Sequence, residues 1–269
     1  MLRAIFNKLR IYTELPMVEL IDSKATQPFF NALIAPVLYQ TWEDHFFGKT
    51  HFKEIERFRS LNPELDFRLF DKSDREAYMR EFWGEHPIYP IFTQSQLGPM
   101  KADIFRYCIL FERGGFYFDI SKGCSIPLSS FLQQSSSALI SFESHDCVIP
   151  PDPILEHRLE CSEKQVLQWG MGFAKGHPIL QGMIENICTH YPLFKGKAFE
   201  SPKSAILRFT GPGMFTKSVR EYFENQEDDS VAQAGVDFNG AGIFELQGSW
   251  ARHSKVPSYI NSYHQPIVL

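Results

Sequence analysis

The sequence predicts an α/β fold in which helices flank a mainly parallel central sheet. Short apolar runs alternate with helical segments along the chain, a well-bounded helix leads directly into a buried strand, and polar residues follow the strand ends. With 269 residues, 43% of them hydrophobic, the chain can bury one large core. We expect a single domain over residues 1–269, with 1–33 as an N-terminal extension or amphipathic helix.

The N-terminal half carries the alternation. The apolar run at residues 34–42 predicts a first buried strand, and a helix centred on 52–61 follows and is stopped by an Asn-Pro pair. Residues 66–71 predict a second strand, and 72–83 a helix with its acidic residues early. A strand, a crossover helix and a second strand favour parallel pairing.

The most sharply bounded helix is predicted over residues 98–113. Pro99 suits its first turn, and Gly114 supplies the left-handed residue that ends it. Asp103 and Arg106, three positions apart, are expected to be neighbours on the surface of this helix.

The strand "FYFDI" (116–120) comes next and carries Asp119 near its end, with Ser121 two positions later. Fully apolar strands of this length are typical of buried parallel sheets. Because ligands of open α/β sheets bind beyond the carboxyl ends of the strands, Asp119 and Ser121 are predicted to lie at a binding site.

Later segments are less regular. Residues 137–144 predict another strand, 148–165 a loop or lid, and 224–230 a solvated loop. Helices are expected from Pro178 and after the Gly-Pro-Gly of 211–213. His177, which precedes the first of them, is expected to cap and pack rather than to act as a general base.

Composition excludes some classes of function. The net charge of -5 and the nine scattered histidines disfavour a nucleic-acid partner. Five cysteines without a CxxC pair suit reduced thiols, so we expect a cytoplasmic protein. No run of about 20 apolar residues is present. The helical face of residues 1–10 either contacts the inner face of a membrane peripherally or packs on the protein's own body.

The motifs "VLYQTW", "MKADIFRYCILFERGGFYFDIS", "GHP", "TGPGMFT" and "GSW" follow one another between Pro36 and Trp250. In order and spacing they resemble a glycosyltransferase family with a DxD-containing sugar-binding region. That family includes Golgi α-mannosyltransferases, bacterial capsular polysaccharide transferases and, distantly, the glucosylating toxins. The resemblance implies a GT-A fold with a Rossmann-like sheet, a nucleotide-sugar donor, a divalent cation (Mn²⁺ or Mg²⁺), and transfer with retention.

One residue departs from the family pattern. Ser121 replaces the second Asp of DxD, which binds the cation directly in family members. By resemblance Asp119 keeps its catalytic role beside ribose and metal-bound water, and Ser121 and Ser249 join it as metal ligands. A neutral hydroxyl removes one negative charge and weakens cation binding. Three outcomes stay open: Ser121 ligates with help from C-terminal groups, the enzyme works without metal, or the chain only binds a donor.

The resemblance also assigns the donor contacts. Asp103 and Arg106 match a pair that hydrogen-bonds donor-sugar hydroxyls; the alternative is an intrahelical ion pair worth a few tenths of a kcal/mol. Trp42 is expected to stack on the nucleotide base, Tyr117 to pack near the donor, and Trp250 to fold over it with Ser249. The alternative for Trp42 and Tyr117 is a place in the core.

The function expected is transfer of a hexose, from a UDP-linked rather than GDP-linked donor, to a saccharide or lipid-linked acceptor in surface polysaccharide biosynthesis. Two alternatives stay open. One is a catalytically degenerate binding protein for nucleotide sugars or carbohydrates, and the other is a toxin-like effector that glycosylates a protein.

Overall fold

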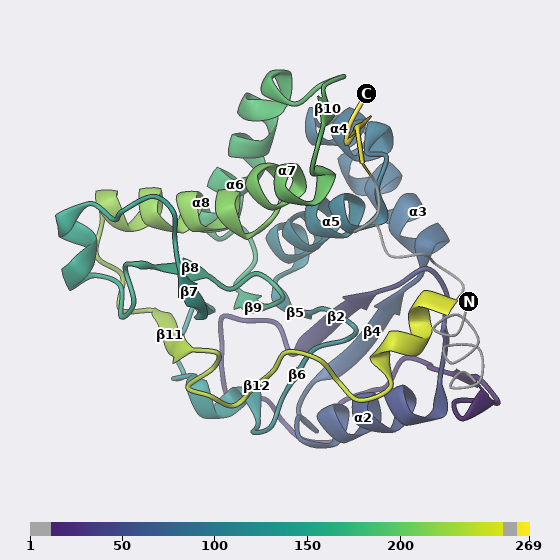
Figure 1. Ribbon diagram of the computed structural model, residues 1–269. Helices are drawn as coiled ribbons and strands as arrows, with labels where there is room; N and C mark the ends of the chain where they lie inside the picture. Colours follow the sequence, from purple (N-terminus) through teal and green to yellow (C-terminus); the bar gives the residue numbers. More distant parts are fainter. Residues whose placement is uncertain (1–11, 255–262) are drawn as a thin grey trace.

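The computed structural model describes residues 12–254 and 263–269, which form a central sheet with strand order β11-β7-β9-β5-β2-β4 (Figure 1). The strands are β2 (Val37–Thr41), β4 (Asp66–Phe70), β5 (Gly115–Phe118), β7 (Ala138–Asp146), β9 (Gly170–Phe173) and β11 (Val231–Val236), with β8 (Lys164–Val166) beside β7. The pairs β2–β4, β2–β5 and β7–β11 are parallel, and β9 is antiparallel to both its neighbours. The predicted mainly parallel sheet is therefore confirmed, with β9 and the short β8 as reversed strands.

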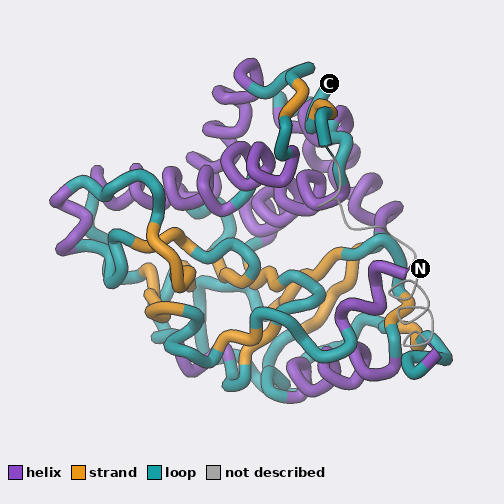
Figure 2. The backbone as a smooth tube through the Cα atoms, in the orientation of Figure 1, coloured by secondary structure: helices purple, strands orange, loops and turns teal. Residues whose placement is uncertain are grey.

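Helices cover the two faces of the sheet unequally. Figure 1 shows α3 to α8 on one side and α2 on the other, and Figure 2 shows the α2 side to consist largely of loops. The helices are α2 (Lys49–Ser60), α3 (Lys72–Trp83), α4 (Ile88–Gln94), α5 (Gly98–Arg113), α6 (Pro178–His190), α7 (Pro202–Phe209) and α8 (Pro212–Asn225). No helix of the described residues is long and apolar enough to span a bilayer.

The alternation of side chains along β5 separates two cores. Tyr117 packs in the core on the α5 side, whereas Phe116 and Phe118 pack in the core on the α2 side. Because successive side chains of a strand point to opposite faces, the residue after Phe118 returns to the α5 side. This places Asp119 next to α5, with its carboxylate at the carboxyl end of the sheet.

Helix boundaries follow local signals closely. Both α3 and α5 begin and end at the predicted residues. Asp71 caps α3 by accepting a hydrogen bond from the Asp74 N–H, and Gly114 ends α5 at a φ of 68°. His177 caps α6, as expected, and its ring accepts from the Ile179 N–H.

Other boundaries differ from the expectation. The strand predicted over 116–120 spans Gly115–Phe118, so Asp119 begins a turn. The predicted loop of 148–165 contains a 3-10 helix, Pro153–His157, and runs into β8. Two α-helices and three strands of the central sheet lack a counterpart in the prediction: α4, α7, β8, β9 and β11.

The described part of the N-terminal extension packs on the sheet's body. Strand β1 (Val18–Glu19) pairs with β3 (Phe46–Phe47), and the Asn31 amide donates to the carbonyls of Gln133 and Ser136. The amphipathic segment 1–10, and with it the membrane contact, lies outside the described residues. The single-domain organisation and the cytoplasmic location stay predictions.

Candidate active site

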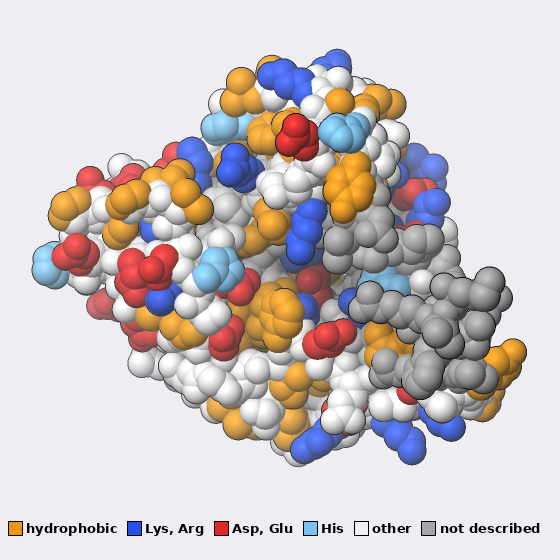
Figure 3. Space-filling model, viewed as in Figure 1, with side chains coloured by type: hydrophobic (Ala, Val, Ile, Leu, Met, Phe, Trp, Pro, Cys, Tyr) orange, Lys and Arg blue, Asp and Glu red, His pale blue; other side chains and the backbone are white. Residues whose placement is uncertain are grey.

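A cavity of about 1430 Å³ lies at the carboxyl ends of β2 and β5. Its walls come from α5, the turn after β5, α7, the start of α8 and the 3-10 helix Ser249–Ser254. Figure 3 shows the molecule hollowed near the middle of this face, with acidic and basic atoms in the hollow. Pockets for one drug-sized ligand measure about 300–1,000 Å³, so this cavity has room for two substrates.

The Asp119 carboxylate is held at one oxygen. The Arg106 Nη2 donates to Asp119 Oδ1 at 3.0 Å, and the Tyr117 hydroxyl donates to the same oxygen at 3.1 Å. The Asp119 side chain is still 31% exposed and lines the cavity. Asp119 is thus oriented by two buried donors while its carboxylate stays open to a ligand.

Asp103 and Arg106 form a buried ion pair at the floor of the cavity. Arg106 Nη2 lies 3.1 Å from Asp103 Oδ1, and the Thr210 hydroxyl donates to Asp103 Oδ2 at 2.9 Å. The two residues are neighbours as predicted, but they are 6% and 4% exposed, so their placement on the helix surface was wrong. The α5 face that carries them packs against the sheet and against Thr210, which lies between α7 and α8.

Burial shapes the charges of this group. It raises the pKa of Asp103, and the nearby Arg106 and the Thr210 hydrogen bond oppose that effect. Arg106 also donates from Nη1 to the Gln168 carbonyl at 3.1 Å, and its guanidinium lies 4.6 Å from the centroid of the Tyr117 ring. Its Nη2 therefore contacts both carboxylates, while Nε and Nη1 donate to the backbone carbonyls of Ala102 and Gln168.

A buried histidine supports the turn that carries Asp119. The His51 Nε2 lies 2.9 Å from the Ile120 carbonyl oxygen and donates to it, and the Leu246 N–H donates to the Ser121 carbonyl at 2.8 Å. Burial lowers the pKa of His51 to about 4, so its ring is neutral near pH 7. The contact joins α2 to the turn across 69 positions, and no motif in the sequence signals it.

The predicted nucleotide contacts are only partly brought together. Trp42 and Tyr117 line the cavity, but Tyr117 is fully buried beneath Arg106. Trp42 has the Arg252 guanidinium 5.6 Å from its ring centroid and the His253 ring 5.9 Å away. Trp250 is half-buried and is not among the described residues that line the cavity.

The two serines differ in position. Ser121 is buried and lines the cavity. Ser249 is completely buried, donates to Glu245 Oε1 at 3.2 Å, and is not among the described lining residues. Among the C-terminal groups that could help to hold a cation, Asn261 lies outside the described residues. The ligand roles of both serines stay predictions.

A divalent cation needs several oxygen ligands around one point. Near Asp119 the described residues offer its open carboxylate and the Ser121 hydroxyl, but the adjoining side chain is the cation Lys122. Four carboxylates line the cavity: Glu43, Asp103, Asp119 and Glu143. Among the described residues, no three of these carboxylates lie close enough together to hold one metal ion. The described residues around Asp119 therefore do not fit the cation that the family pattern implies.

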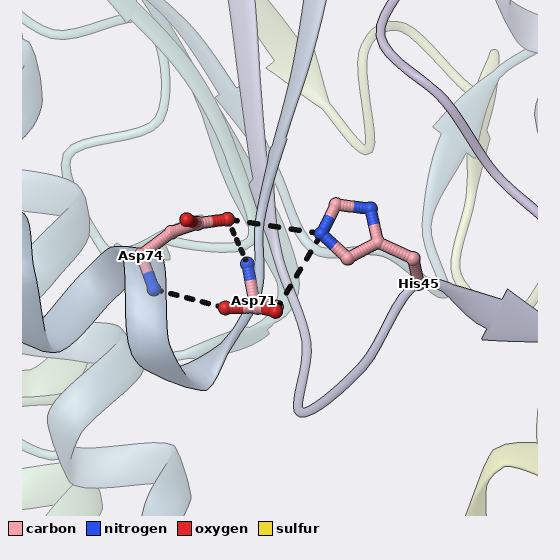
Figure 4. A group of neighbouring side chains, drawn as sticks. All are labelled: His45, Asp71 and Asp74. Atoms are coloured by element: carbon pink, nitrogen blue, oxygen red, sulfur yellow. Dashed lines mark hydrogen bonds and ion pairs between the residues drawn. The ribbon is translucent and has the colours of Figure 1, made fainter.

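One group with the spacing of metal ligands lies outside this cavity. His45, Asp71 and Asp74 bring their ligand atoms within 4.8 Å of one another (Figure 4). The His45 Nε2 is 3.7 Å from a carboxylate oxygen of each acid, and its Nδ1 lies 3.2 Å from the Leu20 carbonyl oxygen. The two carboxylates also accept the backbone N–H groups that cap α3.

Comparison with known proteins bears on this site. The family described as "Glycosyltransferase sugar-binding region containing DXD motif" matches residues 48–138, which include α5, Asp119 and Ser121. An initiation-specific alpha-1,6-mannosyltransferase of Candida albicans is 28% identical over 207 residues, or 70% of this chain and 53% of the relative. An inositol phosphoceramide mannosyltransferase 3 of Schizosaccharomyces pombe is 25% identical over 68% of this chain and 44% of the relative.

The chain spans about half the length of these curated relatives. Among solved structures, the PaToxG glycosyltransferase superposes with a TM-score of 0.51 at 12% identity, over 83% of this chain and 78% of that one. This likeness confirms the GT-A type of α/β fold. Residues 48–138 thus match the sugar-binding region of the DXD glycosyltransferase family, and the resemblance inferred from the motifs is confirmed.

Proposed function

We propose that this protein is a glycosyltransferase that moves a hexose from a nucleotide-sugar donor to an acceptor, with retention at the anomeric carbon. The observation that carries the proposal is the contact of Asp103, Arg106 and Asp119 at the floor of one cavity. The geometry presents a fixed carboxylate at the end of the sheet, where an α/β fold binds its ligand. The mannosyltransferase relatives support the same class of reaction.

The names of the relatives indicate which nucleotide-sugar donor to test first. Both sequence relatives described above are mannosyltransferases. We therefore place a mannosyl donor first among the candidates to be tested, ahead of the UDP-linked hexoses that the motifs favoured.

The wall of the cavity that α7 forms supports a lipid-linked saccharide as acceptor. Lys203, Leu207 and Arg208 line it from the exposed face of α7. At the rim, Val148 and Ile149 are 95% and 70% exposed. Cations beside exposed apolar side chains suit an acceptor that joins an anionic group to an apolar chain. The relative named for inositol phosphoceramide agrees with this acceptor class. A role in surface polysaccharide assembly belongs to the same proposal.

The test is turnover of purified wild type and Asp119→Asn with GDP-mannose, UDP-glucose and UDP-galactose, with and without a lipid-linked saccharide. We expect one donor to be consumed by wild type and the rate to fall at least about 100-fold in Asp119→Asn. Asp229→Asn, at an exposed acid outside the cavity, is the matched control and should keep full activity. The anomeric configuration of the product, read by NMR, tests retention.

Two results would contradict the proposal. Equal turnover by wild type and Asp119→Asn would remove Asp119 from the chemistry. Donor binding without turnover of any nucleotide sugar would favour the degenerate binding protein, which the Ser121 substitution makes the second candidate.

A further inference from the structure

We propose that Lys122 and Arg252 bind the diphosphate of the donor and neutralise it as it leaves, in place of the divalent cation that a DxD pair holds. This inference rests on the proposed function. It assigns a diphosphate-binding role to two side chains that lie outside the DxD pattern.

The reaction sets the need for positive charge. The bond between the anomeric carbon and the diphosphate oxygen breaks, and its electron pair stays on that oxygen. The acceptor hydroxyl oxygen bonds to the anomeric carbon, and its proton passes to the released diphosphate. Fixed cations beside the leaving oxygens stabilise this charge, and either a metal ion or Lys and Arg side chains can supply it.

Lys122 directly follows the serine that interrupts the DxD pattern. Its side chain is half-buried and lines the cavity. Its Nζ lies 3.3 Å from the centroid of the Phe244 ring and donates to the Phe244 carbonyl oxygen. Burial lowers the pKa of Lys122, and the negative charge of Asp119 opposes that effect.

Arg252 reaches the same cavity from the C-terminal part of the chain. It belongs to the 3-10 helix Ser249–Ser254, and its Nη1 donates to the Ser249 carbonyl. Its guanidinium stands over the ring of Trp42, the residue expected to stack on the base. Burial lowers the pKa of Arg252, whereas Asp119 and Glu245 raise it.

The Lys122 and Arg252 side chains form no ion pair within the described residues. In the described ranges 12–254 and 263–269, no carboxylate lies within ion-pair distance of Lys122 or Arg252. Arg106, in contrast, already bridges Asp103 and Asp119. Two half-buried positive charges without a carboxylate partner are costly unless an anion joins them, so a diphosphate between them would complete the site.

The same charges explain why the residues do not suit a divalent cation. Asp119 Oδ1 is already occupied by Arg106 and Tyr117, and Ser121 contributes no charge. A cation placed beside Ser121 would be close to the Lys122 ammonium, and like charges in a partly buried site repel strongly. The replacement of the second Asp by Ser121 and the presence of Lys122 thus have the same consequence, because both favour a protein cation over a metal ion at this site.

The test is calorimetric binding of UDP and GDP to the full chain, in excess EDTA and separately in Mn²⁺. We expect wild type to bind one of them with a Kd that differs less than about threefold between the two conditions. Lys122→Gln and Arg252→Gln should each weaken binding at least about tenfold in EDTA, which corresponds to the loss of one charge-assisted contact. Lys53→Gln, at an exposed lysine of α2 outside the cavity, is the control.

Conservative variants protect the test against misfolding. Lys122→Arg and Arg252→Lys keep the charge and should restore most of the affinity. Binding by wild type only in Mn²⁺, or unchanged binding by both Gln variants, would overturn this inference and leave the proposed function standing. No binding of either nucleotide under any condition would overturn both.

Discussion

Two clusters in this molecule bring a pair of carboxylates to a basic side chain, and they differ in almost every other respect. At the floor of the cavity, Arg106 contacts Asp103 and Asp119 at 3.1 and 3.0 Å, with two of the three residues buried. At the start of α3, His45 lies 3.7 Å from Asp71 and Asp74, and all three are partly exposed (Figure 4).

The difference shows what distinguishes a binding site from a structural cluster. The Asp71 and Asp74 carboxylates are oriented by backbone N–H groups of the first turn of α3, an arrangement that completes the helix. The positive end of the helix dipole also opposes a bound cation there. The cluster of Asp103, Arg106 and Asp119, here called the floor cluster, instead leaves the Asp119 carboxylate facing a large cavity. We therefore expect the floor cluster to govern binding of the donor. We expect the cluster of His45, Asp71 and Asp74, here called the α3 cluster, to affect only the stability of the fold.

The largest effect is expected from Arg106→Gln. Removing the guanidinium leaves two carboxylates without their cation in a buried site, and breaking such a pair costs about 3–5 kcal/mol of unfolding free energy. The control is Arg113→Gln on the same helix, because Arg113 pairs with Glu112 while 36% exposed and should cost less than about 1 kcal/mol. Urea unfolding measures both. Similar losses of unfolding free energy in the two variants would mean that the buried ion pairs of Arg106 stabilise the fold no more than an exposed pair does.

A smaller effect is expected from protonation of His51, whose ring donates a hydrogen bond to the turn after Asp119. Its pKa is lowered by burial to about 4, and the unfolded value is near 6.5. The unfolded chain therefore binds more protons between these values, so the contribution is complete above about pH 6.5 and is lost as pH falls towards 4. The loss amounts to about 3 kcal/mol. Comparison of wild type with His51→Gln by urea unfolding from pH 7 to pH 4 should show a shallower dependence in the variant. Parallel curves would contradict the assignment.

The smallest effect is expected from Asp71→Ala. Loss of the N-cap should lower the unfolding free energy by about 1 kcal/mol, without changing the affinity for a nucleoside diphosphate. Thermal unfolding in Mn²⁺ or Zn²⁺ sharpens the comparison. An increase in Tm on adding metal to wild type, absent in Asp71→Ala, would show that the α3 cluster is itself a metal site and would break the distinction drawn here.

Local signals predicted the elements that position the floor cluster. The limits of α3 and α5 could be read from residues within one turn of each end, because capping and the left-handed glycine act locally. The faces of the sheet to which the buried side chains of β5 point follow from the twofold period of a strand. Strand β9 escaped prediction because two of its four residues are glycines and its pairing is made by the backbone. A Cβ on Gly172 would come 2.6 Å from the Phe116 ring, so the close approach requires glycine.

By itself, then, the sequence determined the α/β class, the helix that carries Asp103 and Arg106, and the position of Asp119 after a buried strand. These depend on neighbours a few positions apart. Only the tertiary structure decided that Arg106 is buried between both acids, that His51 supports the turn, and that Arg252 faces the same cavity as Lys122 from 130 positions away. The physical reason is that charges and carbonyls far apart in the chain meet only when the sheet and its covering layers pack, and no periodicity in the sequence records those meetings.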